Sequence, residues 1–304
     1  MINTCASINV KRRAFELYPS VPWSFLGLDN TEVSYDKAKF IVVPVPYDST
    51  ESYRAGSRNG PHQVIDASRY IELFDLESQS EPYKKGIYTL PEMEVIKGNP
   101  LEMLDRIRNV VKKLLNENKT PILIGGEHTI SLGAIMAFDK DVVVIDLDAH
   151  SDLRNSYEGS QYSHACVMRR IFESGRSLIE VGVRAMSQEE FDFAKEKNIP
   201  IYFRTMLKKN FRKFLAKINE QIKGKNVYLS IDVDVFDPSE APGVSTPEPD
   251  GLTFSEVKEI IKTICNSAVI KGIDLVEVTP IPGNTITEFL SARILYKTIC
   301  YITY

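Results

Sequence analysis

The sequence predicts an α/β protein built on one mostly parallel sheet of about eight strands. Short β-branched apolar runs alternate with longer amphipathic stretches along the whole chain, which is typical of strands joined by right-handed helical crossovers. Several runs are apolar at every position, as expected for strands that helices cover on both faces. No repeat, low-complexity tract or Gly/Ser linker divides the 304 residues. We therefore expect a single domain over residues 1–304, with an N-terminal extension (about 1–35) packed on it.

Eight segments are predicted strands because they are short, apolar and rich in Val and Ile. In chain order they are Phe40–Val45, Gly86–Thr89, Ile122–Ile124, Val142–Leu147, Leu178–Val183, Pro200–Phe203, Val227–Ile231 and Gly272–Val276. Eight further segments carry apolar residues at helical spacing and are predicted helices. They are Gly60–Glu72, Pro100–Asn116, Thr129–Phe138, Ser163–Glu173, Gln188–Lys197, Lys208–Ile222, Thr253–Cys265 and Asn284–Tyr301. Small polar residues with acids in the following turn predict helix starts at Ser187 and Ser255.

Composition and charge exclude several classes of protein. Lys and Arg total 37 against 41 Asp and Glu, a net charge of −4, whereas a protein that coats nucleic acid carries a basic excess. The longest apolar runs fall far short of the ~20 residues of a membrane span. The basic trio at 11–13 is followed by Glu16, Pro19 and Pro22, so no secretory segment is expected. The four cysteines form no Cys-x-x-Cys pair, which favours reduced thiols and a cytoplasmic location.

Histidines and acids follow four of the predicted strands at the point where each strand ends. These segments are Gly125-Gly126-Glu127-His128, Asp148-Ala149-His150-Ser151-Asp152, Asp232-Val233-Asp234 and Glu277. Ligands of parallel sheets bind beyond the carboxyl ends of the strands, so these side chains are expected at one edge. Successive side chains of an extended chain point to opposite faces. Positions 148, 150 and 152 therefore converge, as do 232 and 234, whereas Ala149 and Val233 face the packed side.

Six of these side chains form a candidate metal site. They are His128, Asp148, His150, Asp152, Asp232 and Asp234. Carboxylates gathered in a partly desolvated cleft repel one another and take up protons unless cations lie among them. Structural zinc prefers four N/S ligands and magnesium keeps its waters; a carboxylate-rich set with imidazole fits Mn²⁺, and carboxylates that can bridge suggest a pair of ions. Alone, Asp-x-Asp is more often a helix cap and Gly-Gly-Glu-His a plain loop, whereas Asp-x-His-x-Asp is evenly balanced between a plain loop and a ligand set. Their coincidence at three strand ends favours the metal.

The other candidate groups differ in how much chemistry they suggest. His164 begins a predicted helix just after the Asp148–Asp152 loop, where it could act as a proton shuttle or be an ordinary solvated helix residue. His62 follows Pro61 in a first helical turn and suggests no chemistry. Cys166 is expected to be a packing residue, and the basic cluster at 208–213 a solvated helix face.

These motifs resemble the ureohydrolase family, the arginases and agmatinases. Three family signatures are intact: the Gly-Gly-Glu-His segment, the Asp-x-His-x-Asp segment and a third that begins at Ser230. The third comprises Ser230, Asp232, Asp234, Asp237-Pro238, Ala241-Pro242-Gly243, Thr246-Pro247 and Gly251-Leu252. The segment Tyr47-Asp48-Ser49-Thr50, with Gly56 and Gly60-Pro61, is similar to the N-terminal loop of the family. The resemblance therefore covers nearly the whole chain.

The resemblance implies a three-layer αβα sandwich of the arginase/deacetylase type with two Mn²⁺ ions per chain. One ion would be held by His128, Asp148, Asp152 and Asp232, and the other by Asp148, His150, Asp232 and Asp234. It implies that Glu277 anchors a guanidinium group and that His164 carries protons between cleft and solvent. A metal-activated water would attack the guanidinium carbon, and Asp152 would pass a proton to the leaving amine. A homo-oligomer, a trimer or a hexamer, is also implied.

Agmatine is the expected substrate, with urea and putrescine as products in polyamine biosynthesis. The polar stretch with which arginases grip the α-amino acid head is absent after Asp152, where the sequence has Leu-Arg-Asn-Ser-Tyr-Glu-Gly-Ser-Gln-Tyr over 153–162. An unpaired charged head would cost several kcal/mol, which disfavours arginine. Glu158 is a candidate partner for the distal ammonium of agmatine. Aminopropylagmatine, guanidinobutyrate and arginine are the alternative substrates.

Two other classes of function are weighed against this one. A zinc deacetylase of the same fold would carry a tandem His pair, and no His-His occurs in the chain. A non-catalytic homologue would have lost metal ligands, and all six are present.

Overall fold

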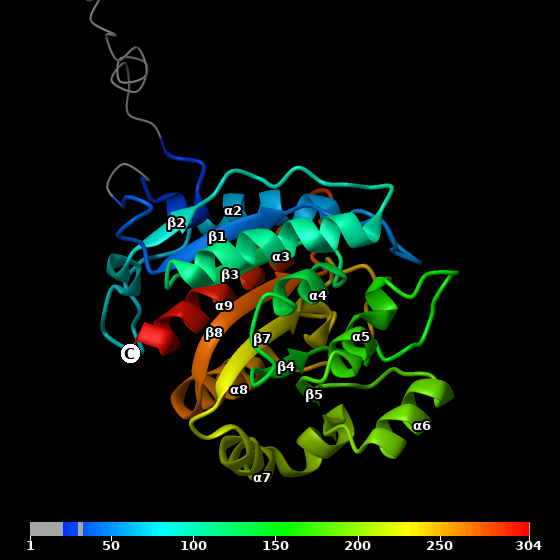
Figure 1. Ribbon diagram of the computed structural model, residues 1–304. Coiled ribbons are helices and arrows are strands. Elements are labelled where there is room, and N and C mark those ends of the chain that lie inside the picture. The colour runs from blue at the N-terminus through cyan, green and yellow to red at the C-terminus, as the bar shows by residue number, and fades with distance from the viewer. Residues whose placement is uncertain (1–20, 30–32, 304) are drawn as a thin grey trace, which may run out of the picture.

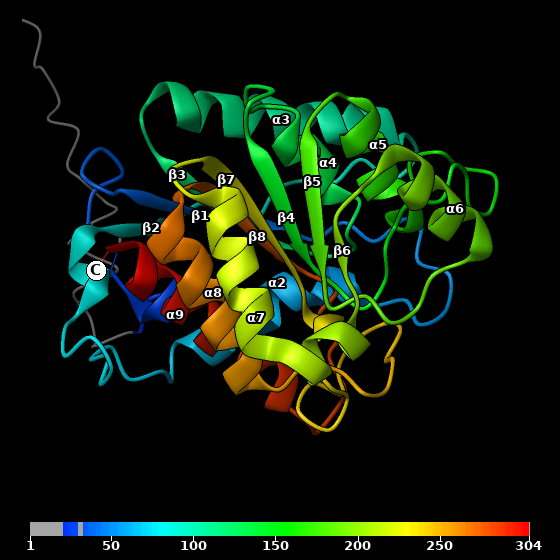
Figure 2. The ribbon, with the colours of Figure 1, turned by 90° about the horizontal axis from the view of Figure 1, so that it is seen from below.

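The computed structural model describes residues 21–29 and 33–303, in which eight parallel strands form one sheet (Figures 1 and 2). The strands are β1 (Phe40–Val45), β2 (Ile87–Thr89), β3 (Thr120–Gly125), β4 (Val143–Leu147), β5 (Ser177–Val181), β6 (Ile201–Tyr202), β7 (Asn226–Asp232) and β8 (Val269–Val276). All eight predicted strands are present, and every neighbouring pair is parallel. The expected extension over about 1–35 falls largely on residues 1–20 and 30–32, outside the described part, and stays a prediction.

The strand order is β2-β1-β3-β8-β7-β4-β5-β6. The last strand of the chain, β8, therefore lies inside the sheet between β3 and β7. The four strands that precede the predicted site residues, β3, β8, β7 and β4, are consecutive in this order. Because all of them run in the same direction, their carboxyl ends meet at the centre of one sheet edge.

Eight α-helices are found in the described residues. They are α2 (Gly60–Ser68), α3 (Pro100–Asn116), α4 (Ile130–Ile135), α5 (Val167–Glu173), α6 (Gln188–Lys197), α7 (Arg204–Ile222), α8 (Phe254–Ser267) and α9 (Ile286–Thr303). Short 3-10 helices lie between them: η1 (Phe25–Gly27), η2 (Ser57–Asn59), η3 (Pro82–Lys85), η4 (His164–Cys166) and η5 (Val233–Val235). None of the helices in the described ranges is long and apolar enough to cross a membrane.

The helices cover both faces of the sheet, as Figure 2 shows from below, and one hydrophobic core lies on each face. Residues of α2, α7, α8 and α9 pack with one set of strand side chains, including Phe40 and Val42 of β1. Residues of α3, α4, α5 and α6 pack with the alternate set, including Ile41 and Val43. The continuous apolar runs of the sequence are explained by this double burial. The predicted three-layer αβα sandwich is confirmed.

Several predicted helix boundaries are wrong. The segment 163–173 divides into η4 and α5, and α2 ends at Ser68, four residues early. Helix α7 begins at Arg204 and is kinked at Asn210 (φ −147°, ψ 54°). The cap at Ser187 is confirmed by a capping box with Glu190, but α8 is capped by Thr253, not Ser255, because Thr253 and Glu256 bond each other reciprocally.

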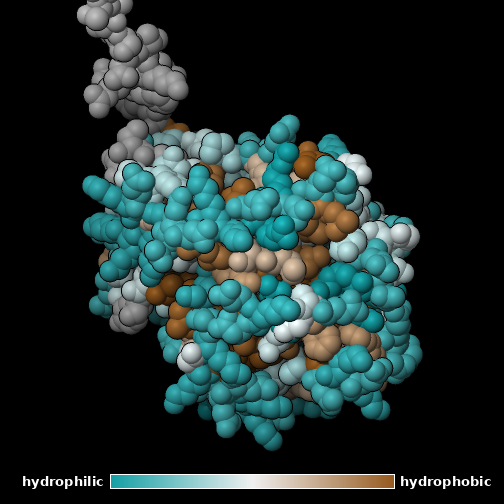
Figure 3. Space-filling model, in the orientation of Figure 1, coloured by the Kyte–Doolittle hydropathy of each residue, from teal (hydrophilic) through white to brown (hydrophobic). Residues whose placement is uncertain are grey.

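The minor sequence predictions agree with the structure. Lys208, Lys209, Arg212 and Lys213 are exposed, and the surface around α7, at the bottom of Figure 3, is hydrophilic. Cys166 is a buried free thiol. His62 is exposed and stacks on Trp23 with ring centroids 4.9 Å apart.

A charge cluster joins the loop after α2 to the C-terminal helices and gives a pH-dependent prediction. The hydrogen bond from Lys262, with others from Tyr301 and Lys297, lowers the pKa of Glu77 to about 2. A carboxylate whose pKa is lower in the folded state stabilises the folded protein at pH values above its unfolded-state pKa. This stabilisation is lost as the pH falls towards the folded-state pKa. We expect Glu77→Gln to lower the free energy of unfolding by about 1 kcal/mol at pH 7, since the group is partly exposed.

This difference between wild type and Glu77→Gln should shrink between about pH 5 and about pH 3, because the wild-type carboxylate is then being protonated in the unfolded state. Urea denaturation of both proteins at the two pH values measures it. A difference that stays constant over this interval would contradict the charged role of Glu77.

Candidate metal centre

The loop after β3 is brought close to the neighbouring loops by a glycine. A Cβ atom at Gly126 would lie 2.1 Å from the carbonyl oxygen of Tyr47, so only glycine fits there. The carbonyl oxygen of Gly126 accepts a hydrogen bond of 2.8 Å from the backbone N–H of Glu277, which follows β8. The ends of β1, β3 and β8 are thereby held together, and His128 is placed at the centre of the edge.

Three acids converge on one nitrogen of His128. Its Nδ1 atom lies 3.1 Å from Asp148 Oδ2, 3.2 Å from Asp152 Oδ2 and 3.5 Å from Asp232 Oδ2. Both His128 Nδ1 and Asp148 Oδ2 are buried and have no hydrogen-bond partner. Buried polar atoms without a partner are rare in folded proteins. A cation among these four groups would satisfy them.

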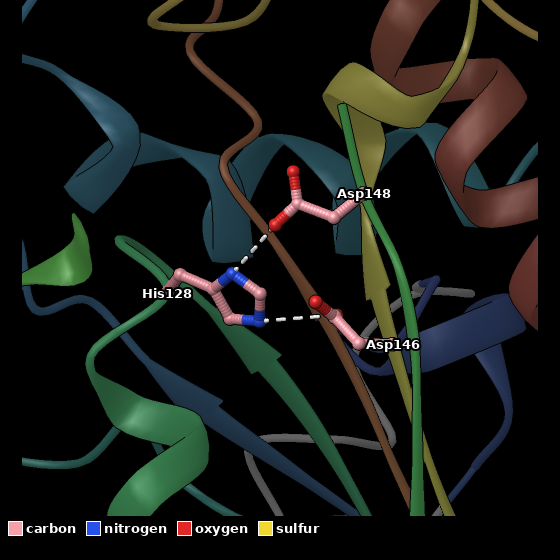
Figure 4. Close-up of side chains that lie close together, drawn as sticks. All are labelled: His128, Asp146 and Asp148. Atoms are coloured by element: carbon pink, nitrogen blue, oxygen red, sulfur yellow. Dashed lines mark ion pairs between the residues drawn. The ribbon is translucent and has the colours of Figure 1, made fainter. Parts of the chain in front are cut away.

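The opposite nitrogen of His128 is occupied by a hydrogen-bond network. Nε2 lies 2.9 Å from Ser230 Oγ, and this hydroxyl donates its proton to Asp274 Oδ1 at 2.7 Å. Ser230 Oγ must therefore accept from Nε2–H, which leaves a lone pair on Nδ1. Asp146 Oδ1 lies 3.6 Å from Nε2, so Asp146 and Asp148 flank the ring from two sides (Figure 4). A histidine that donates its second N–H in this way is oriented as a metal ligand.

A second group of candidate ligands shares Asp148 with the first. His150 Nδ1 lies 2.8 Å from Asp234 Oδ2 and 3.7 Å from Asp148 Oδ1. The ligand atoms of Asp148, His150 and Asp234 are close enough to hold one ion, as are those of His128, Asp146 and Asp148. Asp148 is common to both groups. Asp146, in contrast, approaches His128 at Nε2, the nitrogen that Ser230 already contacts.

Backbone N–H groups orient three of the acids. Asp148 Oδ1 accepts from the N–H of His150 at 2.5 Å, Asp232 Oδ1 from Asp234 at 2.8 Å, and Asp234 Oδ1 from Ala149 at 3.0 Å. In each case the other oxygen turns towards a histidine of the cluster. Asp232 thus caps η5 as well as facing the cluster. The two interpretations of the Asp-x-Asp motif, helix cap and ligand pair, are compatible.

The pKa shifts of the clustered side chains indicate that the site favours bound positive charge. Burial and the neighbouring Asp234 and Asp148 raise the pKa of Asp232 well above its usual value. Burial also raises the pKa of Asp152 to about 7. Although burial opposes it, the carboxylates of Asp234 and Asp148 raise the pKa of His150 to about 12. Protons would thus collect on these groups, and divalent cations, which prefer such oxygen-rich sets with imidazole, would replace them.

A cavity of about 350 Å³ opens onto this cluster, a size within the range of ligand pockets. His150, Asp152, His164 and Glu277 are among the residues that line it. Glu277 is buried, and its two oxygens accept from the backbone N–H of His128 (2.7 Å) and from Ser245 Oγ (2.8 Å). Burial, with Glu51 nearby, raises its pKa. Asp152 and Glu277 have φ angles of 51° and 67°, left-handed values that are uncommon outside glycine and recur at functional sites.

Comparison with known proteins agrees with this geometry. The model of the arginase family matches residues 38–300. The chain belongs to the arginase family. It is 35% identical over 293 residues to N(1)-aminopropylagmatine ureohydrolase of Synechocystis sp., covering 93% of this chain and 95% of that protein. It is 35% identical over 254 residues to the agmatinase of Bacillus cereus, covering 82% and 86%.

A solved structure of the arginase family has the same fold. The agmatine ureohydrolase of Thermoplasma volcanium superposes with a TM-score of 0.85 at 32% identity, over 96% of this chain and 97% of that one. The prediction of an arginase-family hydrolase is confirmed by these matches. The His/Asp cluster at the sheet edge is the candidate metal centre of this arginase-family chain.

Sequence reasoning missed some residues of this arginase-family site. Glu158 is exposed in the tight turn from Tyr157 to Ser160 and is not part of the cavity lining, which instead includes Tyr157 and Glu248. No local motif marks Glu248, which lies in a long loop. Asp146 could have been found, because it precedes Asp148 by two residues in β4 and so shares its face of the sheet.

Glu190 is another lining residue that the sequence suggested only as part of a helix cap. Its Oε1 atom accepts from Ser151 Oγ (2.9 Å) and from the N–H of Leu153 (3.1 Å), and its Oε2 atom from the N–H of Ser187 (2.6 Å). Glu190 therefore joins the loop after β4 to the start of α6. These hydrogen bonds hold one side of the cavity in place.

Proposed function

We propose that this protein holds two Mn²⁺ ions and hydrolyses a linear guanidino compound with a cationic distal end, agmatine in the first place, to urea and an amine. The observation that carries the proposal is the convergence of all six predicted ligands at the ends of β3, β4 and β7, beside a cavity lined by Glu277. One ion would be held by His128, Asp148, Asp152 and Asp232, and the other by Asp148, His150, Asp232 and Asp234. His128 Nδ1 and Asp148 Oδ2, which are buried without a hydrogen-bond partner, support this assignment.

The chain's own residues would divide the work of the reaction. When bound, the two cations supply the Lewis acidity that makes water a nucleophile near neutral pH. Glu277 pairs with the guanidinium group and orients its carbon towards the cluster. Asp152, whose pKa burial raises to about 7, passes a proton to the leaving amine. His164 exchanges protons between the cavity and solvent.

A second candidate substrate is N(1)-aminopropylagmatine, because the Synechocystis relative that matches almost the whole chain bears the name of that activity. It shares the guanidinium end with agmatine and is longer at the amine end. A role in polyamine biosynthesis, a cytoplasmic location and assembly into a trimer or hexamer belong to the same proposal.

Urea release tests the proposed function. The protein is loaded with Mn²⁺ and offered agmatine, aminopropylagmatine, guanidinobutyrate and arginine in turn, and its metal content is measured in parallel. We expect two ions per chain and the fastest urea release from agmatine or aminopropylagmatine. A protein that holds two ions but releases no urea from any of the four would overturn the proposal.

Glu248 is proposed as the acid that meets the distal ammonium. It is half-buried in the cavity wall, with Oε1 4.0 Å from His150 Nε2. We expect Glu248→Gln to raise the KM for agmatine about 10-fold with little change in kcat, because one charged contact is worth about 1.4 kcal/mol. Butylguanidine, which lacks the ammonium, should be hydrolysed equally well by both proteins.

Glu158→Gln is the matched control for this variant, since Glu158 is an exposed acid outside the cavity. Its kinetic constants should equal those of the wild type. Equal effects of Glu248→Gln on agmatine and butylguanidine would show that Glu248 does not recognise the ammonium.

A further inference from the structure

Three loops meet at the hydroxyl group of Thr50. Thr50 follows β1, Glu127 follows β3, and His164 opens η4, so these residues lie 77 and 114 positions apart in the chain. The N–H of Thr50 donates to Glu127 Oε2 at 2.6 Å, and Thr50 Oγ1 donates to Glu127 Oε1 at 2.8 Å. The backbone N–H of His164 donates to the same hydroxyl oxygen at 3.1 Å, and His164 Nδ1 lies 3.3 Å from it.

Glu127 has no place in the proposed chemistry, although it precedes the candidate ligand His128. Its side chain is fully buried and is not part of the cavity lining. Both carboxylate oxygens instead receive hydrogen bonds from Thr50. A buried carboxylate held in this way can act on the cavity through the groups that it contacts, and the Thr50 hydroxyl is the contact that leads to His164.

The directions of the hydrogen bonds at Thr50 Oγ1 indicate which nitrogen of the His164 ring carries the proton. A hydroxyl has one proton to donate and two lone pairs. Thr50 gives its proton to Glu127, its shortest side-chain contact, and accepts from the N–H of His164. With Glu127 ionised, the hydroxyl has only a lone pair left for Nδ1, so Nδ1 carries the ring proton. The Nε2 atom then has a free lone pair on the edge of the ring that is left for the cavity.

His128 is held by a second hydroxyl–carboxylate pair of the same kind. Ser230 donates to Asp274 and accepts from Nε2 of His128, which fixes the opposite tautomer. The two histidines thus have different free nitrogens because the two hydroxyls contact different edges of their rings.

We propose that Thr50, backed by Glu127, is a positioning residue for His164: it holds the ring at the cavity and keeps the proton on Nδ1, so that Nε2 is free to accept protons. The kinetic consequence rests on the proposed function, but the tautomer is a property of the folded protein itself. Burial keeps His164 neutral near pH 7, since it lowers its pKa to about 4.

Three variants test the proposal. Thr50→Val removes the hydroxyl at constant shape, Thr50→Ser keeps it, and Glu127→Gln reverses its direction. In the last variant the glutamine oxygen must accept from the N–H of Thr50, so its amide group faces Oγ1 and donates. Thr50 must then give its own proton to Nδ1, which would place the ring proton on Nε2.

The first measurement is the tautomer of His164. Nitrogen-15 correlation spectra of the histidine rings are recorded on protein loaded with Zn²⁺, which is diamagnetic. With four histidines in the chain, the His164 signals are assigned by their loss in His164→Asn. We expect the Nδ1–H form in wild type and Thr50→Ser, a mixture in Thr50→Val, and the Nε2–H form in Glu127→Gln.

The second measurement is turnover of the Mn²⁺-loaded enzyme. In Thr50→Val and Glu127→Gln we expect kcat to fall up to about 10²-fold, the contribution of a positioned acid–base group, with KM and metal content little changed. Thr50→Ser, which keeps the hydroxyl, should have the kcat of the wild type. The proposal would be overturned if the ring stayed entirely in the Nδ1–H form in Thr50→Val or Glu127→Gln. It would also be overturned if Thr50→Ser lowered kcat as much as Thr50→Val does. Absence of urea release by wild type would instead refute the proposed function, and the spectra would still decide the role of Thr50.

Discussion

Asp232→Asn is expected to lose at least one of the two proposed metal ions and to release urea about 10³-fold more slowly or worse, since metal activation contributes several kcal/mol. Asp232 would bridge both ions, with Oδ2 3.5 Å from His128 Nδ1. Asparagine has the same shape, and its carbonyl oxygen can still accept the hydrogen bond from the N–H of Asp234. The fold should therefore survive while the bridging charge is lost. Elemental analysis and urea release measure the two effects.

Asp250→Asn is the matched control for this prediction. Asp250 is exposed, with φ of 59°, a value that asparagine tolerates, and its Oδ1 atom accepts from Lys208 at 2.9 Å. This variant should keep both ions and full activity. If Asp232→Asn also keeps two ions per chain, the bridging assignment is wrong.

Glu277→Gln is expected to keep both ions and to lose about 10²- to 10³-fold in kcat/KM for every guanidine, because a buried charged hydrogen-bond pair is worth about 2–4 kcal/mol. Glu277 lines the cavity, and its oxygens are fixed by His128 N–H and Ser245 Oγ. Glutamine keeps one acceptor and the side-chain volume but removes the charge that faces the guanidinium group. Steady-state kinetics and metal analysis separate this loss from damage to the centre.

Glu288→Gln serves as the control for Glu277→Gln, since Glu288 is also buried but lies in α9, outside the cavity lining. Its kinetics should match those of the wild type. A Glu277→Gln variant with wild-type kcat/KM would remove Glu277 from the proposed substrate site.

Local patterns in the sequence were sufficient to predict most of the elements. The predicted bounds of β1, α3 and α6 agree with the structure, because apolar periodicity and a Pro or Ser at the helix start are local signals. The start of α7 at Arg204 and its kink at Asn210 were missed, since nothing in the spacing of apolar residues marks them. Strand order could not be derived from the residues either, because it depends on which strands pair across long separations.

In the candidate site, too, residues marked by a local pattern were predicted, whereas partners from distant parts of the chain were not. The polar residues after β3, β4, β7 and β8 were found because each follows a strong apolar strand. The partners that orient them were not found. Ser230 lies 102 positions from His128, and Thr50 lies 114 positions from His164. Glu248 was missed and Glu158 was suggested in its place, because which face a loop residue presents depends on tertiary packing.

The position of β8 has a consequence for how the protein matures. The ribosome makes this strand last among the eight, yet it inserts between β3 and β7, which carry His128 and Asp232 at their ends. Until β8 is added, His128 belongs to a sheet fragment that shares no edge with β7 and β4, the strands that precede the other five candidate ligands. The ligand set that contains His128 is therefore completed only when the last strand of the chain has inserted.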